Sequence, residues 1–155
     1  NPRAKALYEY AQQRRAAAAE AFAKAENGRL PARVVFRSPV ALERFNQIAE
    51  RQGLKVERFR LRVVEEDGTE AIIGGVPDAN GRINRADLDR FVEVHQSKKP
   101  VALWVEGVFD ATVEVDQAAY EHLEAQPDVF LVDVTPEQDD TATLFDEMLD
   151  AGMVE

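Results

Sequence analysis

The chain has 155 residues, and 45% of them are hydrophobic. A chain of this size buries roughly two thirds of its unfolded surface, so it can form one domain with a core. It contains no cysteine, which excludes a disulfide framework, a thiol nucleophile and a cysteine zinc site. The net charge of -10 argues against general nucleic-acid binding, because phosphate contacts require a surplus of Lys and Arg. We predict no cofactor.

The charge is distributed unevenly along the chain. Residues 1–62 contain 14 Lys or Arg against 6 Asp or Glu, whereas residues 63–155 contain 5 against 23. The first segment is therefore +8 and the second -18. This polarity is typical of complementary halves, of a charged partner or of an acidic tail.

No apolar run approaches the roughly 20 residues needed to span a bilayer, and no signal peptide is visible. The chain begins at Asn1 rather than Met. From this we expect a preceding export signal or membrane anchor, and hence an extracytoplasmic location.

Residues 3–26 are predicted to form a long helix that is followed by a left-handed cap at Asn27 and Gly28. Its predicted inner positions recur at spacings of three and four and are Ala4, Tyr8, Ala11, Arg15, Ala18, Phe22 and Ala25. Because this stripe is small and contains an arginine, we expect the helix to contribute little to the core. Deletion of residues 1–27 is then expected to leave a folded domain, which we assign to residues 32–135, after an N-terminal segment 1–28.

Residues 33–37 alternate as a short strand, with Val34 and Phe36 on one face and Arg33, Val35 and Arg37 on the other. A helix is predicted next, with Ser38 as its N-cap and Pro39 at its first position. Its buried stripe is predicted to be Leu42, Phe45, Ile48 and Ala49.

Residues 55–64 form the next predicted strand, in which Phe59, Leu61 and Val63 alternate with Arg58, Arg60 and Arg62. Asp67 and Gly68 predict a hairpin turn, and residues 71–76 the return strand. Within that strand we interpret Gly74 and Gly75 as a kink, because no phosphate-binding glycine pattern surrounds them.

The loop that follows contains four residues spaced like the ligands of a calcium loop, which are Asp78, Asn80, Asn84 and Asp87. This stretch resembles part of a dockerin loop, but Asp78 and Asn80 lie two residues too close to Asp87. The alternative is local: Asn80 and Gly81 form a turn, Asn84 caps a helix, and Asp87 occupies the N3 position of that helix. We favour the local interpretation and predict no metal.

The capped helix is predicted over residues 85–96, with Leu88, Phe91, Val92 and His95 on its inner face. Residues 101–115 form the longest predicted strand, with a bulge or bend at Gly107. Its buried residues are predicted to be Leu103, Val105, Phe109, Ala111 and Val113. Its outward residues are predicted to be Trp104, Glu106, Asp110, Thr112 and Glu114.

A helix over residues 117–125, capped by Asp116, precedes a final strand over residues 130–134. An acidic segment, residues 136–155, ends the chain and contains a predicted short helix around Leu144, Phe145, Met148 and Leu149. The whole pattern predicts an α+β fold, a ferredoxin-like βαββαβ sandwich with an inserted hairpin strand and helix, preceded by the long N-terminal helix.

Residues 107–134 combine a Phe-x-Ala strand, a helix carrying Leu123, a Pro127-Asp128-Val129 turn and a hydrophobic strand that ends in an acidic residue. This stretch resembles the second half of subtilisin-type propeptides, a family of peptidase inhibitors. The resemblance implies the same sandwich fold and inhibition of a protease by the segment after Val134. The family has a short connection where this chain has an insert of about forty residues.

No catalytic constellation is recognisable in the sequence. His95 and His122 lack metal-ligand spacing, and neither Ser38 nor Ser97 has a recognisable partner base. Arg58, Arg60 and Arg62 form the best binding candidate, with Trp104 beside them, because a period of two places the guanidinium groups on one face. The alternative is neutralisation by Glu106, Asp110 and Glu114 from a neighbouring strand.

We therefore predict a non-enzymatic protein-interaction module. It would belong to a larger bacterial protein that is exported or membrane-anchored. Its partner would be a protein, and an acidic one if the arginine face is the docking surface. The alternative is a propeptide-like peptidase inhibitor. A small enzyme that uses clustered carboxylates is a third, weaker hypothesis.

Overall fold

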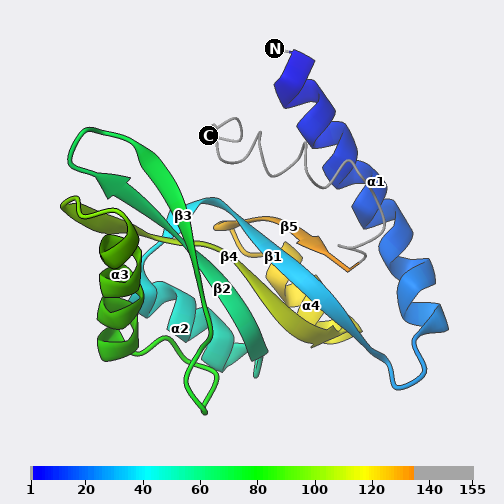
Figure 1. The fold of residues 1–155 in the computed structure, drawn as a ribbon. Helices are drawn as coiled ribbons and strands as arrows, with labels where there is room; N and C mark the ends of the chain where they lie inside the picture. Colours follow the sequence, from blue (N-terminus) through cyan, green and yellow to red (C-terminus); the bar gives the residue numbers. More distant parts are fainter. Residues whose placement is uncertain (1, 135–155) are drawn as a thin grey trace. The chain divides into compact units, whose positions relative to one another are not determined.

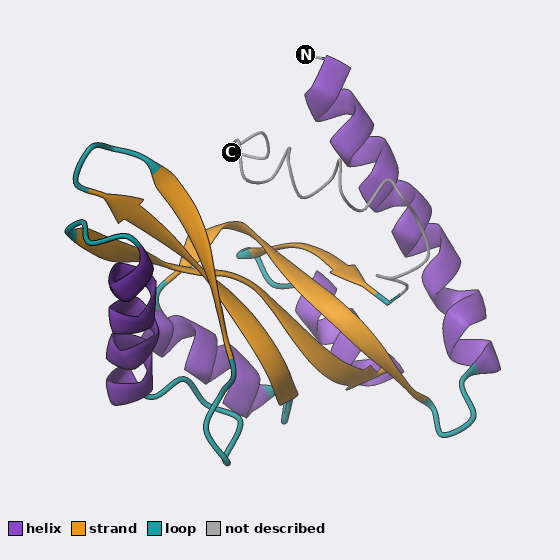
Figure 2. Ribbon diagram, in the orientation of Figure 1, coloured by secondary structure: helices purple, strands orange, loops and turns teal. Residues whose placement is uncertain are grey.

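The computed structural model describes residues 2–134, which form four helices and five strands (Figures 1 and 2). In chain order these are α1 (Pro2–Lys24), β1 (Arg29–Val40), α2 (Leu42–Arg51), β2 (Lys55–Glu65), β3 (Glu70–Gly75), α3 (Arg85–Lys98), β4 (Leu103–Asp116), α4 (Gln117–Glu124) and β5 (Val129–Asp133). The strands form one antiparallel sheet in the order β3-β2-β4-β1-β5. The predicted α+β class and long N-terminal helix are confirmed.

The chain divides into two compact units. The terminal unit combines Asn1–Ser38 with Glu114–Glu155, and the central unit is Pro39–Val113. The predicted acidic segment 136–155, with Leu144, Phe145, Met148 and Leu149, lies outside the described residues. Within the described residues, no helix is long and apolar enough to cross a membrane.

In the terminal unit, α1 packs against β5 through a face that overlaps the predicted one but extends toward Leu7 and Tyr10. Leu7 is fully buried and Tyr10 nearly so, whereas Tyr8 is 46% exposed. Ala11, Ala18 and Phe22 are buried as predicted. The helix is thus rotated so that its larger side chains face the sheet, and the stripe is more apolar than the sequence analysis assumed.

Strands β1 and β5 pair in the terminal unit, with Val34 opposite Val132 and Val35 opposite Leu131. Val35 is fully buried, and its neighbours Val34 and Phe36 are each 2% exposed. Because α1 and α4 both pack against β5, residues of either strand face are buried there.

In the central unit, β2 and β3 form the predicted hairpin, closed by the Glu65 N–H donating to the Thr69 carbonyl at 2.8 Å. Gly68 occupies the turn with φ of 87°, a left-handed conformation that glycine adopts without strain. Helix α3 packs against the hairpin, and the Phe59 and Phe91 rings lie 5.7 Å apart.

The prediction that Ser38 and Pro39 open helix α2 is wrong, because both residues belong to β1. Ala41 is the N-cap instead, and no side chain caps the helix. A residue that precedes proline is driven toward extended backbone, so the Ser-Pro pair prolongs the strand. Of the predicted stripe, Phe45, Ile48 and Ala49 are buried as expected, whereas Leu42 is half-buried.

Gly107 occupies a position in β4 that only glycine can fill. A Cβ atom there would lie 2.4 Å from the Val40 carbonyl oxygen, and φ is 156°. The predicted irregularity of β4 at this residue therefore reflects a close approach of two backbones within the central unit.

Candidate functional site

The predicted arginine face of β2 is largely occupied by the protein's own side chains. Arg58 is exposed, Arg60 is half-buried and Arg62 is 5% exposed. Arg60 donates two hydrogen bonds to the Asp110 carboxylate, at 2.8 and 2.5 Å. Asp110 itself is 3% exposed, and its predicted pairing with the arginine ladder is confirmed.

Arg62 is paired with a residue that the sequence analysis did not consider. Its Nη1 donates to the Glu70 carboxylate of β3 at 2.6 Å. Phe109 lies beneath both guanidinium groups, 5.3 Å from Arg60 and 5.0 Å from Arg62, which permits cation–π attraction. The predicted core position of Phe109 thus also supports the arginine ladder.

The remaining members of the predicted face are dispersed. Glu114 lies 3.9 Å from Arg29 in the terminal unit, so its predicted pairing with the ladder is wrong. Glu106 is exposed, and Trp104 is 56% exposed. Arg58 and Trp104 therefore remain as accessible members of the predicted binding set.

The four calcium candidates each have a local role in the structure. Asp78 Oδ1 accepts from the backbone N–H groups of Asn80 and Arg82, at 2.8 and 3.1 Å. Asn84 caps α3 by accepting from the Ala86 N–H at 2.8 Å, as predicted, and Asp87 pairs with Arg90. In the described part of the chain, no group of three or more Asp, Glu or His side chains is arranged to hold a metal ion.

Asn46 holds this loop in place, a role that the sequence analysis missed. Its amide accepts from the Ile83 N–H at 3.0 Å and donates to the Ile83 carbonyl at 3.1 Å. Ile83 is 3% exposed. Only the folded chain brings α2 and this loop together, because the two residues are 37 positions apart.

A buried carboxylate joins the end of β2 to the end of α3. Glu65 is 2% exposed, and its oxygens lie 2.6 Å from Lys99 Nζ and 3.8 Å from His95 Nε2. The hydrogen bond and charge of Glu65 raise the pKa of Lys99. Ser97 donates to the Val94 carbonyl within α3. The contacts of Glu65 with Lys99 and His95 therefore anchor the end of α3 to the end of β2. The Ser97 hydroxyl takes no part in this cluster, because it bonds within its own helix.

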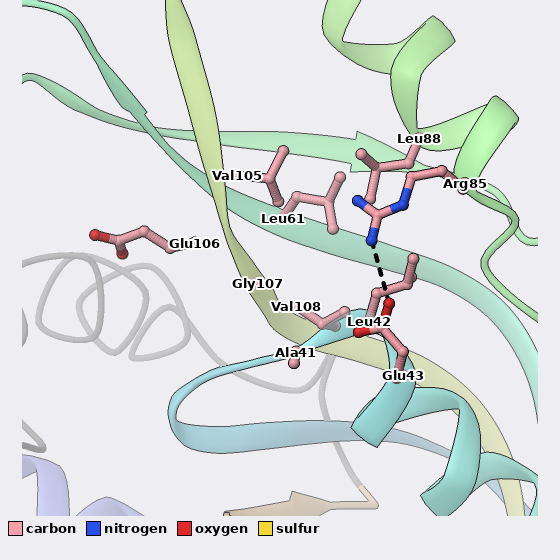
Figure 3. A pocket seen from close by; sticks show the side chains of 10 residues that line it. All are labelled: Ala41, Leu42, Glu43, Leu61, Arg85, Leu88, Val105, Glu106, Gly107 and Val108. Atoms are coloured by element: carbon pink, nitrogen blue, oxygen red, sulfur yellow. Dashed lines mark hydrogen bonds and ion pairs between the residues drawn. The ribbon is translucent and has the colours of Figure 1, made fainter.

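A pocket of about 160 Å³ lies in the central unit between the start of α2, α3 and β4 (Figure 3). Its apolar lining comprises Leu42, Leu61, Leu88, Val105 and Val108. Arg85 and Glu43 form a 3.1 Å ion pair at its rim, and Glu106 points away from them (Figure 3). Ligand pockets are typically about 300–1,000 Å³, so this one fits a single side chain rather than a cofactor.

The outer edge of β5 is closed by side chains of the terminal unit. Arg15 of α1 donates to the Phe130 carbonyl, and Glu124 of α4 accepts from the Val132 N–H at 2.7 Å. Arg15 and Glu124 also pair with each other at 3.1 Å. Together they satisfy backbone groups that an additional strand would otherwise bind.

Among residues 2–134, no side chain closes the outer edge of β3 in this way. In an antiparallel pair, hydrogen-bonded and non-hydrogen-bonded residues alternate along each strand. The Glu65 N–H bonds to the Thr69 carbonyl, so this is a hydrogen-bonded pair. Every second pair along the hairpin is then hydrogen-bonded too, which gives Val63 with Ala71 and Leu61 with Ile73. The backbone N–H and C=O groups of Ala71 and Ile73 therefore face β2. The N–H and C=O groups of the alternate residues point outward, and these are Glu70, Ile72 and Gly74.

No described residue hydrogen-bonds to these outward backbone groups of β3. Gly74 is exposed, and a Cβ atom built on it would meet nothing within 4 Å. The Glu70 charge is paired with Arg62 in the same hairpin. The edge therefore presents donors and acceptors without a covering side chain at Gly74.

No protein-family model matches the chain, and no curated protein or solved structure matches it either.

Proposed function

We propose that this chain is a non-enzymatic protein-interaction module in which β3 pairs with an extended segment of a partner protein. The observation that carries the proposal is the open outer edge of β3, at Glu70, Ile72 and Gly74. An exposed strand edge is a template for another strand, and main-chain hydrogen bonds then supply much of the affinity.

The composition of β3 supports strand addition. Proteins commonly protect edges with charged side chains, prolines or bulges. Here the one charged residue, Glu70, is held by Arg62, and Gly74 places no side chain along the edge. Ile72 is half-buried and offers an apolar contact to an incoming strand.

An acidic partner is favoured by fewer residues than the sequence analysis expected. Arg60 and Arg62 are paired with Asp110 and Glu70, so the exposed Arg58 is the cation of the ladder that remains for a partner carboxylate. An exposed ion pair contributes about 0–1 kcal/mol, so charge tunes the choice of partner while backbone pairing provides the contact.

The experiment is a selection of extended peptides from a random library on the wild-type chain, followed by titration against Ile72→Pro. Proline removes the outward N–H of residue 72 while the neighbouring ladder bonds to β2 remain. We expect the selected peptides to lose at least tenfold in affinity. Peptides that bind the two proteins equally, or a selection without binders, would refute the proposal. The control is Val94→Ala, a substitution on the exposed face of α3, which should leave binding unchanged.

We further infer that the fold is ferredoxin-like. If β3 is set aside as an added edge strand, the remaining order is β2-β4-β1-β5 with helices α2 and α4 in the two connections. This is the arrangement expected for a βαββαβ sandwich.

The propeptide-like inhibitor is the second candidate function. Residues 107–134 form the strand, helix and strand that the resemblance implies, with Phe109, Leu123 and Phe130 buried. Incubation with a panel of subtilisin-like proteases tests it. Slow, stoichiometric inhibition would support this function, and rapid digestion without inhibition would remove it.

A further inference from the structure

We infer that the extended segment that pairs with β3 is β3 of a second copy of this chain, in an antiparallel pair centred on Ile72. This inference rests on the proposed strand addition at the β3 edge. It names the occupant of that edge, and it predicts a symmetric dimer.

The register follows from the position of the outward residues. Ile72 is the middle one of the three residues whose backbone groups point away from β2. A two-fold axis beside Ile72 places the two Ile72 residues opposite each other, and Glu70 of each copy opposite Gly74 of the other. This register uses every outward N–H and C=O group, and the contact is self-complementary, as a two-fold interface requires.

Two alternative symmetric registers are less favourable. An axis beside Glu70 would place two carboxylates opposite each other, which destabilises a strand pair. An axis beside Gly74 would leave Glu70 without an opposing residue of β3 and would remove the apolar Ile72 contact. The Ile72 register avoids both penalties.

The Ile72 register also places each Glu70 opposite a residue without a side chain. Within the hairpin, Gly74 is the register partner of Arg60. In the dimer, Glu70 of the second copy would lie beyond Gly74 and would meet no opposing side chain there. The Arg60–Asp110 and Arg62–Glu70 pairs of each copy can therefore stay as they are.

The contact at the centre of the dimer is between two apolar side chains. Arg62 is the register partner of Ile72 and lies over Phe109. The two Ile72 side chains would contact each other between the two buried arginine pairs. A six-residue edge buries little area, so we expect a dimer that dissociates in the micromolar range, as small interfaces do.

The first experiment is sedimentation of the full chain over a concentration series. We expect a shift from monomer to dimer with increasing concentration. Ile72→Lys places two ammonium groups opposite each other and should raise the dimer dissociation constant at least tenfold, whereas Ile72→Val should leave it nearly unchanged. A wild-type chain that stays monomeric at about 200 μM, well above the expected range, would overturn the inference.

The second experiment uses the absence of cysteine from the sequence. Ile72→Cys carries one thiol at the proposed axis, where the two Cα atoms would be about 5.5 Å apart. A short bismaleimide should link it into dimers, whereas Val94→Cys, at an exposed position of α3, should react without forming dimers. Equal linking of both variants would refute the register.

The two proposals can fail separately. A monomeric chain that binds selected peptides, and loses them with Ile72→Pro, would overturn the dimer and keep strand addition to a foreign segment. A dimer unaffected by Ile72→Lys would overturn the dimer through β3, and the peptide titration would still decide whether β3 is a docking edge.

Discussion

The two edge strands of the sheet, β3 and β5, differ in how their outward backbone groups are bonded. Each has backbone groups on its outer side. In the terminal unit, Arg15 and Glu124 bond to those of β5, whereas in the central unit no described residue bonds to those of β3. Within the described residues, the two edges therefore differ in whether side chains bond to their outer backbone groups.

The largest expected effect comes from removing α1, which should leave the Phe130 carbonyl of β5 without its Arg15 donor. Deletion of residues 2–27 would remove Arg15 and the buried Leu7 and Phe22. Burial of such side chains contributes about 1.5–3 kcal/mol each, so we expect these two alone to account for a loss of roughly 3–6 kcal/mol. This reverses the expectation from the sequence that the remaining domain stays folded.

Thermal and urea unfolding of the deletion variant provide the measurement. We expect loss of a cooperative transition, or association that is absent from the full chain. An unchanged midpoint would show that α1 does not close the β5 edge.

A smaller change to the same edge is Glu124→Ala, which leaves the Val132 N–H without its acceptor. Loss of a buried hydrogen-bond partner costs about 1–3 kcal/mol. Glu124→Gln keeps an acceptor oxygen and should cost less. The control is Lys24→Ala, which removes an exposed pair with Glu20 and should change the free energy of unfolding by at most about 0.5 kcal/mol. Equal effects of Glu124→Ala and Lys24→Ala in urea unfolding would contradict this account of the edge.

Alanine substitutions at two adjacent glycines of β3, Gly74 and Gly75, form a matched pair of variants that tests whether the β3 edge is uncovered. A Cβ atom at Gly75 would lie 2.7 Å from the Phe59 ring, whereas at Gly74 it would meet nothing within 4 Å. We expect Gly75→Ala to cost about 1–3 kcal/mol through overpacking. Gly74→Ala should be neutral or stabilise by up to about 1 kcal/mol, because alanine restricts the unfolded chain. Urea unfolding of both variants tests this, and a costly Gly74→Ala would mean that the edge is already covered.

The smallest expected effect is an alkaline one in the terminal unit. Burial, and then the negative charge of Asp133, raise the pKa of Tyr10, whose hydroxyl donates to Asp133 at 3.1 Å. The folded chain therefore keeps the Tyr10 proton at a pH where the unfolded chain loses it. The stabilisation is present below the ordinary pKa of 10.0 and is lost as the pH rises through the raised value.

Unfolding measured between pH 9 and pH 11 should show this loss in the wild type, and a weaker pH dependence in Tyr10→Phe. Since Tyr120 also has a raised pKa, caused first by burial, part of the dependence should remain in that variant. An identical slope in the two proteins would exclude Tyr10 as its source.

Much of the local structure could be predicted from the sequence. Asn84 and Asp116 cap their helices as expected, because each accepts a hydrogen bond from a backbone N–H only two or three residues further on. The β2–β3 hairpin follows from alternating residues and a short turn that contains Gly68. Such features depend on contacts between near neighbours in the chain, which a sequence pattern displays directly.

The positions that the sequence did not determine depend on distant partners. The face of α1 could be assigned only after β5 was in place, since Leu7 and Tyr8 are one residue apart and both are apolar enough to be buried. Arg62 looks like an exposed member of a ladder until Glu70 and Phe109 pack around it.

The two strand edges show the same limit most clearly. Arg15 and Glu124 close the β5 edge together, although they are 109 positions apart in the sequence. No sequence pattern near β5 reveals that Arg15 takes part. The alternation of β3 by itself determined which residues share a face. Only the tertiary structure decided that no described side chain closes its outer edge, because that depends on which side chains the rest of the fold brings within hydrogen-bonding distance.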